Sequence, residues 1–219
     1  MSLHMDFTQR VVIDSESLDW EASPMSGVER RKLEREAAES DRATSLVRYA
    51  PDSHFSPHTH TGGEEFLVLE GVFSDETGDF GPGSYVRNPI GSTHKPHSDD
   101  GCVIFVKLDQ FNSGDTELVR VETANIPWLP GLVDGLSVKP LHEFGTEHVA
   151  LVQWAPGTQF TRHAHLGGEE IFVLDGVFED EHGSYSKGTW IRGPHNSVHT
   201  PFSTEGCTIW VKTGHLPPY

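Results

Sequence analysis

Short apolar runs separated by turn residues set the pattern of this 219-residue chain. Runs such as FLVL in EEFLVLEG and IFVL in EEIFVLDG are apolar at consecutive positions, which is typical of strands covered on both faces. Glycine, proline and asparagine, the residues that favour turns, bound these runs. Other segments of this kind are GSYVRNP, GCVIFVK, ALVQWAPG, GTWIRGP and GCTIWVK. Packed sheets or barrels cover both faces of a strand, so the pattern predicts an all-β protein.

This strand-and-turn pattern occurs twice along the chain. HTHTGGEEFLVLEGVF, residues 58–73, matches HAHLGGEEIFVLDGVF, residues 163–178, at 11 of 16 positions. The offset of 105 residues continues without a gap toward the C-terminus and becomes 108 nearer the N-terminus. Self-similarity at a fixed offset indicates duplication. We therefore predict two tandem domains, over residues 7–110 and 118–214, joined by a polar linker.

The repeat also bears on one ambiguous segment. Residues 28–40, VERRKLEREAAES, contain strong helix formers and favour a helix by propensity. Their counterpart, residues 136–148, contains a proline and a glycine and alternates more like a strand. We predict a strand over about 28–33 and a return strand over about 43–49. A helix over residues 28–40 is the alternative.

Composition and charge narrow the classes of function. The chain has 33 acidic and 16 basic residues, a formal charge of −17. The electrostatic field of a negatively charged protein repels phosphate backbones and anionic lipid, so we expect no nucleic-acid or membrane partner. The same field attracts cations, including metal ions. No run approaches the ~18 apolar residues of a membrane span, and the N-terminus lacks the features of a signal peptide. Two cysteines, Cys102 and Cys207, are too few for a disulfide framework. We expect a cytoplasmic protein.

Histidines and a glutamate of the first repeat form a candidate metal site. His58 and His60 lie two residues apart, so on a strand both imidazoles leave the same face. Glu64 follows a Gly-Gly turn that can fold its carboxylate back beside them, and His94 follows another strand and a tight turn. Imidazole nitrogens and one carboxylate oxygen suit zinc, iron(II), manganese, nickel or copper, and suit calcium poorly.

The second repeat supplies the same residue types at identical spacings. An isolated pair of histidines often arises by chance, whereas four ligand-type residues kept in two diverged copies are harder to attribute to chance. Neighbouring positions differ between the copies, as Thr59 and Ala164 do. We predict one divalent transition metal in each domain, with the second held by His163, His165, Glu169 and His199.

Two arginines are candidate pocket residues. Arg87 shares a strand face with Tyr85, and Arg192 shares one with Trp190. If that face is the inner wall of a barrel, these four residues can hold an anionic ligand near the metal. Salt bridges at the rim are the alternative.

The quoted segments resemble the signature motifs of the cupin family. HTHTGGEEFLVLEG is similar to G(X)5HXH(X)3,4E(X)6G, with Asp52 in place of the first glycine. GSYVRNPIGSTH is similar to G(X)5PXG(X)2H. In the second copy Gly157 keeps the first glycine, and Asn196 stands at the inner glycine of the second motif. The resemblance implies two tandem cupin double-stranded β-helix (jelly-roll) barrels, each holding a metal, in a bicupin.

Longer strings narrow this resemblance. ATSLVRYAP, GGEEFLVLEGVFSDE, GSYVRNPIGSTHKPHS and GCVIFVKL are similar to the cupin-like domain of ChrR, an anti-sigma factor of the singlet-oxygen and oxidative-stress response. The resemblance implies zinc held by three histidines and a glutamate at the eight positions named above. ChrR-type proteins grip the sigma factor with a zinc domain built around an HxxxCxxC pattern, and these 219 residues contain no such pattern.

Two functions remain open on this reading. A zinc ion with four protein ligands is structural by default. We therefore favour a regulatory or sensor module in transcription regulation, with a metal-linked change that releases a protein partner. The alternative is a metal-dependent enzyme of the dioxygenase type, because three histidines and one glutamate on Fe²⁺ or Mn²⁺ leave two positions open. Ni²⁺ is a further alternative to Zn²⁺. Assembly into a homodimer stays open.

Overall fold

The computed structural model describes residues 2–37 and 41–217. Apart from 3-10 turns at Ser15–Ser17 and Thr123–Asn125, the regular structure of these residues is β-strand, which confirms the all-β prediction. No helix in these two ranges is long and apolar enough to cross a membrane.

The ambiguous segment forms a strand. β3 (Val28–Arg35) pairs antiparallel with β4 (Ala43–Tyr49), so the strand prediction is confirmed and the helical alternative is wrong. Pairing with β4 and burial of Val28 and Leu33 outweigh the helix propensity of the sequence, because propensity is a weak prior against tertiary packing.

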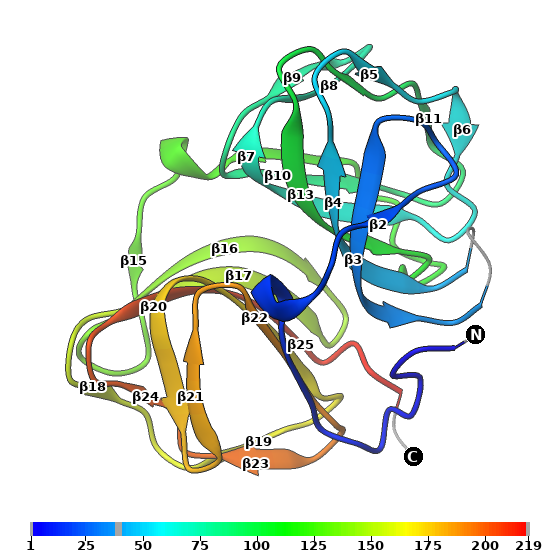
Figure 1. Ribbon diagram of the computed structural model, residues 1–219. Helices are drawn as coiled ribbons and strands as arrows, with labels where there is room; N and C mark the ends of the chain where they lie inside the picture. Colours follow the sequence, from blue (N-terminus) through cyan, green and yellow to red (C-terminus); the bar gives the residue numbers. More distant parts are fainter. Residues whose placement is uncertain (1, 38–40, 218–219) are drawn as a thin grey trace. The chain divides into compact units, whose positions relative to one another are not determined.

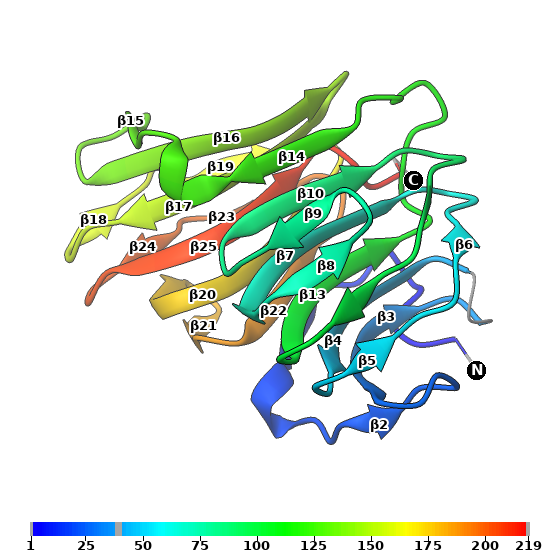
Figure 2. The ribbon, with the colours of Figure 1, turned by 90° about the horizontal axis from the view of Figure 1, so that it is seen from above.

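The first compact unit contains Leu18–Asn125 and the N-terminal residues up to Met5. It holds a 7-stranded sheet, a 4-stranded sheet and a two-stranded ladder (Figure 2). The 7-stranded sheet has the order β14 (Val119–Glu122), β10 (Ser84–Asn88), β7 (Glu64–Gly71), β13 (Cys102–Leu108), β4, β3 and β2 (Glu21–Ala22). The 4-stranded sheet has the order β5 (Ser53–His54), β12 (His97–Ser98), β8 (Phe73–Asp75) and β9 (Gly78–Phe80). The two-stranded ladder pairs β11 (Thr93–His94) with β6 (His58–Thr59).

The second compact unit contains Asp6–Ser17 and Ile126–Tyr219. The main path of its large sheet is β1 (Val11–Asp14), β22 (Thr189–Gly193), β20 (Glu169–Asp180), β25 (Cys207–Thr213), β17 (Glu147–Trp154), β16 (Leu136–Phe144) and β15 (Leu129–Pro130). Shorter strands join this sheet or form a separate ladder: β18 (Thr158–Gln159), β21 (Gly183–Ser186) and β24 (Phe202–Ser203), and β19 (His163–His165) with β23 (Ser197–His199).

Residues on both faces of β7 are buried, which explains why this strand can carry consecutive apolar residues. Phe66 and Val68 join the interior cluster of the first unit, together with Ile104 and Val106 of β13. Leu67 points to the other face and is still only 3% exposed. Both faces of this strand are therefore covered, as the run predicted.

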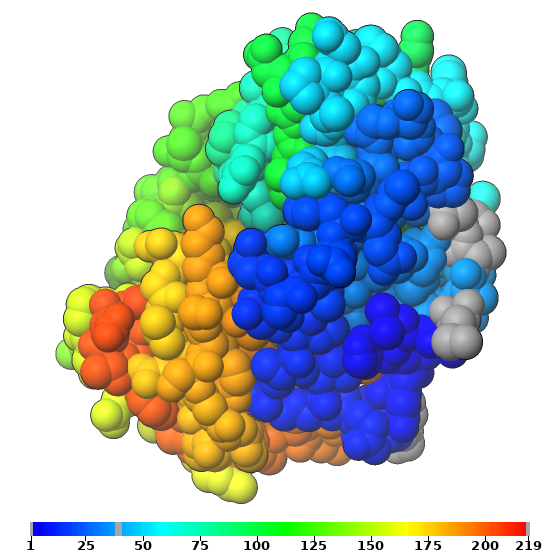
Figure 3. Space-filling view, in the orientation of Figure 1, coloured from blue at the N-terminus to red at the C-terminus, as the bar shows by residue number. Residues whose placement is uncertain are grey.

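Each compact unit takes its first strand from the other repeat. β1 belongs to the dark-blue N-terminal segment and pairs with β22 (Figure 1). The register places Val11 opposite Arg192. β14 pairs with β10 in the same register, placing Val119 opposite Arg87. Within the second unit, the blue segment that carries β1 lies against gold and orange atoms of the second repeat (Figure 3). The compact units therefore differ from the predicted linear ranges 7–110 and 118–214 by the exchange of these first strands.

Two departures from the motif pattern occupy left-handed backbone conformations. Asp52 has a φ of 58°, where the second copy has Gly157 at 79°. Asn196 has a φ of 62°, where the first copy has Gly91 at 84°. Asparagine and aspartate tolerate this region better than other residues with a side chain, so they can replace glycine in these turns.

This conformation leads to a stability prediction at Asn196. Asn196→Ala is expected to lower the free energy of unfolding by about 1 kcal/mol. The Cβ atom of alanine is crowded against the following carbonyl oxygen in a left-handed conformation, and alanine has no polar side chain to offset this. Asn196→Gly serves as the matched control and is expected to be neutral or slightly stabilising. Urea unfolding of both variants measures the difference. Equal destabilisation by alanine and glycine would show that the turn depends on the side chain and not on its φ.

Candidate metal centres

The first candidate centre lies where a short ladder meets the start of β7. β6 and β11 pair so that His58 lies opposite His94, and His60 follows β6 directly. Gly63, with a φ of 80°, turns the chain so that Glu64 begins β7. A Cβ at Gly63 would lie 2.4 Å from the Phe111 ring, so a side chain would not fit there.

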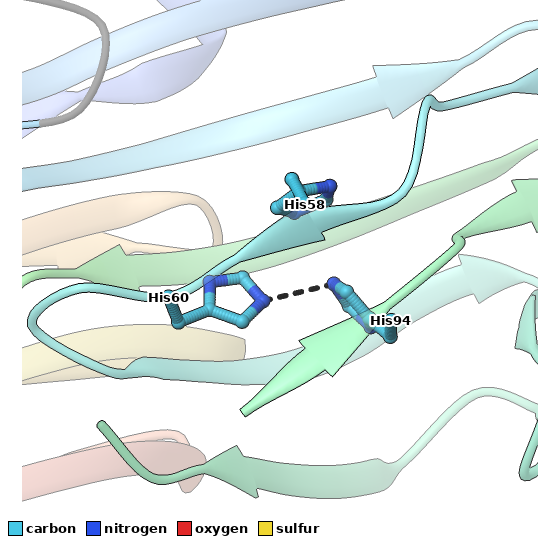
Figure 4. Close-up of side chains that lie close together, drawn as sticks. All are labelled: His58, His60 and His94. Carbon is cyan, nitrogen blue, oxygen red and sulfur yellow. Dashed lines mark hydrogen bonds between the residues drawn. The ribbon is translucent and has the colours of Figure 1, made fainter. Parts of the chain in front are cut away.

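The side chains of the three histidines lie close together (Figure 4). The Nε2 atoms of His60 and His94 are 2.9 Å apart. The Oε2 atom of Glu64 lies 3.4 Å from His60 Nε2 and 3.5 Å from His94 Nε2. A ring nitrogen of His58 lies within 4.8 Å of the other two histidines. Two atoms bound to one ion at about 2.1 Å cannot be more than about 4.2 Å apart, so the three closest donors already satisfy this limit.

Neighbouring groups orient these donors. Asp75 lies 3.3 Å from His94 Nδ1, and the Ser56 carbonyl lies 3.0 Å from His58 Nδ1. Asn88 donates a hydrogen bond of 2.8 Å to Glu64 Oε2. A proton on Nδ1 of His94, facing the Asp75 carboxylate, leaves the lone pair of Nε2 directed at the centre. This is the arrangement that a metal-ligating histidine uses.

The local electrostatics agree with this assignment. Burial alone would raise the pKa of Asp75, but hydrogen bonds from His94 and Thr77 outweigh it and lower the pKa to about 2. Burial lowers the pKa of His60. Burial also opposes protonation of His94, but Asp75 and Glu64 outweigh it and raise the pKa of His94. At neutral pH His60 is therefore a neutral imidazole, the form that binds a metal.

The second centre repeats this geometry in the second unit. β19 and β23 place His163 opposite His199. The Nε2 atoms of His165 and His199 are 3.0 Å apart, and Glu169 Oε2 lies 3.5 Å and 3.4 Å from them. His163 completes the group within 4.8 Å. The eight predicted metal ligands therefore form two groups of four, one in each unit.

The second centre has a different outer shell. Asp180 lies 3.5 Å from His199 Nδ1, the place that Asp75 takes in the first centre. Arg10 Nη2 and the Tyr185 hydroxyl donate to the same carboxylate at 2.9 Å and 2.8 Å. At the corresponding positions the first unit has Leu118 and Phe80. Arg10, next to the exchanged strand β1, thus supports the second centre, whereas Arg120 of the exchanged strand β14 donates to Asn88 beside the first centre.

Asp75 and Asp180 are site residues that the sequence analysis missed. They face the histidine nitrogens that lie away from each centre, and their separation of 105 residues equals that of the ligands. The segments FSDE and FEDE, residues 73–76 and 178–181, carried this signal. An acidic residue kept in register in both copies marks a partner of the ligands.

The second centre leads to a pH prediction. Burial raises the pKa of Glu169 to about 7, so below that pH a proton competes with the metal for this carboxylate. Metal affinity of the second centre is expected to fall about tenfold per pH unit below 7 from this proton alone. Competition with a chelating dye between pH 5.5 and 8 measures the slope, using a His94→Ala variant so that only the second centre is read. A flat profile below pH 7 would contradict the prediction.

A cavity adjoins each centre. The first, of about 340 Å³, is bounded partly by His58, His60 and Glu64. The second, of about 250 Å³, is bounded partly by His163, Glu169 and His199. The donors in each unit therefore line both a metal site and an adjoining space for a small molecule.

The predicted pocket residues lie elsewhere. The linings of these two cavities include none of Tyr85, Arg87, Trp190 and Arg192. Arg87 is fully buried and pairs with Glu65 at 3.1 Å, and the Tyr85 hydroxyl donates to the same glutamate.

The second repeat places its pair in the same way. Trp190 Nε1 donates to Glu170 at 3.2 Å, and Arg192 Nη2 donates to the Asp6 carbonyl at 3.1 Å. Strand alternation places all four residues on the face of the sheet opposite the cavity. The Arg87–Glu65 pair agrees with the salt-bridge alternative, although both arginines are buried and do not lie at a rim.

These sheets and paired histidine-glutamate centres define a protein built from two tandem cupin barrels. The family described as "ChrR Cupin-like domain" matches residues 8–112 and 116–217, and the chain belongs to this family. The predicted resemblance and fold class are thereby confirmed. Among curated proteins no match is found.

Solved structures show the same fold at low sequence identity. A "putative dioxygenase" of Nostoc punctiforme has a TM-score of 0.80 and 16% identity, over 94% of this chain and 82% of that one. The "putative glyoxylate induced protein" of Pseudomonas aeruginosa has a TM-score of 0.76 and 14% identity, over 100% and 93%. Protein Ylba of E. coli has a TM-score of 0.73 and 15% identity, over 98% and 94%.

Proposed function

We propose that this chain is a metal-binding bicupin of the ChrR-like regulatory type, with one transition metal ion in each barrel. The convergence of three histidines and one glutamate in each unit carries this proposal. Zinc is the ion that a closed set of four nitrogen and oxygen donors favours, with Fe²⁺, Mn²⁺ and Ni²⁺ as alternatives.

The residues have distinct roles in this proposal. In the first barrel His58, His60, Glu64 and His94 would hold the ion. Asp75 fixes the tautomer of His94, and Asn88 fixes the carboxylate of Glu64. A bound metal ion ties together β6, β7 and β11, so its loss or the oxidation of a ligand would loosen the end of the barrel. Such a change is the kind that a regulatory protein passes to a partner.

A metal-dependent enzyme of the dioxygenase type is the second candidate. The cavity of about 340 Å³ beside the first centre favours it, because a purely structural metal site needs no adjoining space. The likeness to a "putative dioxygenase" supports the same candidate, although at 16% identity it shows the fold alone. Fe²⁺ or Mn²⁺ would supply open coordination positions for substrate and dioxygen.

Metal analysis separates these candidates. The protein is purified without added metal, its metals are quantified, and X-ray absorption reports the number of ligands. The regulatory proposal predicts about two zinc ions per chain, each four-coordinate, and no dioxygen consumption. Iron or manganese with water ligands, together with dioxygen consumption in the presence of reductant, would overturn it in favour of the enzyme.

A further inference from the structure

An arginine occupies an inward-facing position of the first barrel. Val28 and Arg30 lie two residues apart on β3, so they share a strand face, and Val28 belongs to the interior cluster. Arg30 pairs with Val47, another member of that cluster, and its side chain lines the first cavity. Arg30 is half-buried and brings a positive charge to the wall of this cavity, which makes a role there worth testing.

Tyr49 contributes a second polar group to the same cavity. Its side chain lines the cavity and the residue is only 6% exposed. Its ring contacts Phe55 and Phe73, with centroid separations of 5.6 Å and 5.7 Å. Burial and the Glu64 carboxylate raise the pKa of Tyr49 well above its ordinary value, so the hydroxyl keeps its proton and remains a donor.

The second barrel serves as an internal comparison. Its cavity has Val138 at the position of Arg30 and Trp154 at the position of Tyr49. The two barrels share their sheet order around the centre and their metal donors. Neither the arginine nor the tyrosine is therefore required to form the barrel or to assemble the donors. Arg30 and Tyr49 therefore distinguish the first cavity from the second.

We propose that the first cavity binds a small organic carboxylate, with its anionic group on Arg30 and Tyr49 and its apolar part against the wall formed by Ile104, Val106 and Leu108. Arginine and a neutral hydroxyl are donors matched to a carboxylate. The volume of about 340 Å³ fits a metabolite of modest size. Asp109 also borders the cavity and accepts a hydrogen bond from Thr61 at 3.3 Å.

This assignment deepens the proposed function and rests on it for the adjoining metal. The carboxylate would lie beside His58, His60 and Glu64, which face the same space. In a regulator it would act as the sensed molecule, and in an enzyme as the substrate. The second cavity, lined by valine and tryptophan at the two key positions, would not select for an anion.

The test uses charged and neutral probes of the same shape. The full chain, loaded with its metal, is titrated with benzoate and benzamide, and with butanoate and butanamide, while amide NMR shifts are recorded. We expect each carboxylate to bind more tightly than its amide and to shift signals around Arg30 and Tyr49. Arg30→Val, which copies the second barrel, is expected to weaken carboxylate binding about tenfold or more. Tyr49→Phe is expected to weaken it severalfold.

Controls keep the outcome interpretable. Val138→Arg tests whether a cation confers carboxylate binding on the second cavity, and the melting temperature and metal content of each variant confirm that it is folded and loaded. Equal binding of acids and amides, binding unchanged in Arg30→Val, or no binding of either acid would overturn the assignment. Metal content is measured separately, so loss of the carboxylate site with two metals still bound leaves the proposed function standing.

Discussion

Replacing His94 by alanine is expected to reduce the metal content from two ions per chain to one. Structural zinc sites bind with about 10–16 kcal/mol, so one of four donors contributes on the order of 3 kcal/mol, or about a hundredfold in affinity. His94 is also the ligand that Asp75 orients and that lies 2.9 Å from His60, so its loss disrupts the centre as a whole. Elemental analysis after dialysis against a weak chelator measures the stoichiometry.

The repeat supplies matched controls for this variant. His199→Ala is expected to empty the second centre and leave the first occupied. His54→Ala removes an exposed histidine that belongs to neither centre, and it should retain both ions. Two ions retained in His94→Ala, or both ions lost in either single variant, would contradict two independent four-ligand centres.

Removing residues 1–17 is expected to destabilise the second unit by about 3 kcal/mol or more. The deletion removes β1, with its ladder hydrogen bonds to β22 at about 1 kcal/mol each and the buried Val11. It also removes Arg10 from the Asp180 carboxylate and Phe7 from the face of Arg192. Arg192 is fully buried, and removing contacts from a buried charge lowers the free energy of unfolding.

Hydrogen exchange locates this effect along the chain. We expect faster exchange in β20, β22 and β25 than in the intact protein, and little change in β7, β10 and β13. A chain that begins at Asp6 is the control, because it retains β1 and should leave the second unit unchanged. Equal loss of protection in both units, or none in the second, would contradict the strand exchange.

The sequence predicted the strands and the metal donors because both depend on local or repeated signals. Consecutive apolar residues in β7 indicated a strand covered on both faces. The spacing of His58, His60 and Glu64 recurs in the second copy, which separates ligands from chance histidines. Asp52 and Asn196 replaced glycine without loss of the turn, because both tolerate a positive φ.

The strand exchange could not be predicted in this way. β1 and β14 occupy the same place in their repeats, and their partners β22 and β10 are equally similar. A segment that fits two equivalent edges carries no signal for which edge it joins. Its location depends on the path of the chain between the units.

For a related reason the sequence left both a pocket role and a salt-bridge role open for Arg87 and Arg192. Alternation places Arg87 and Tyr85 on one face, but the sequence does not say which face is inward. The inward cation is Arg30, on a strand that local propensity made ambiguous. Two features of the sequence could have indicated that Arg30 faces the cavity. Arg30 lies two residues after the buried Val28, and the second copy has Val138 in its place.

Anomalous diffraction from crystals of the protein, purified without added metal, tests the central claim most directly. Data collected on both sides of the absorption edge of the metal found in solution locate each ion and identify its element. We predict two peaks per chain, each about 2.0–2.2 Å from three histidine nitrogens and one glutamate oxygen, at His58, His60, Glu64 and His94 and at their four counterparts. Ions bound elsewhere, or both histidine groups without a peak in metal-replete crystals, would contradict it.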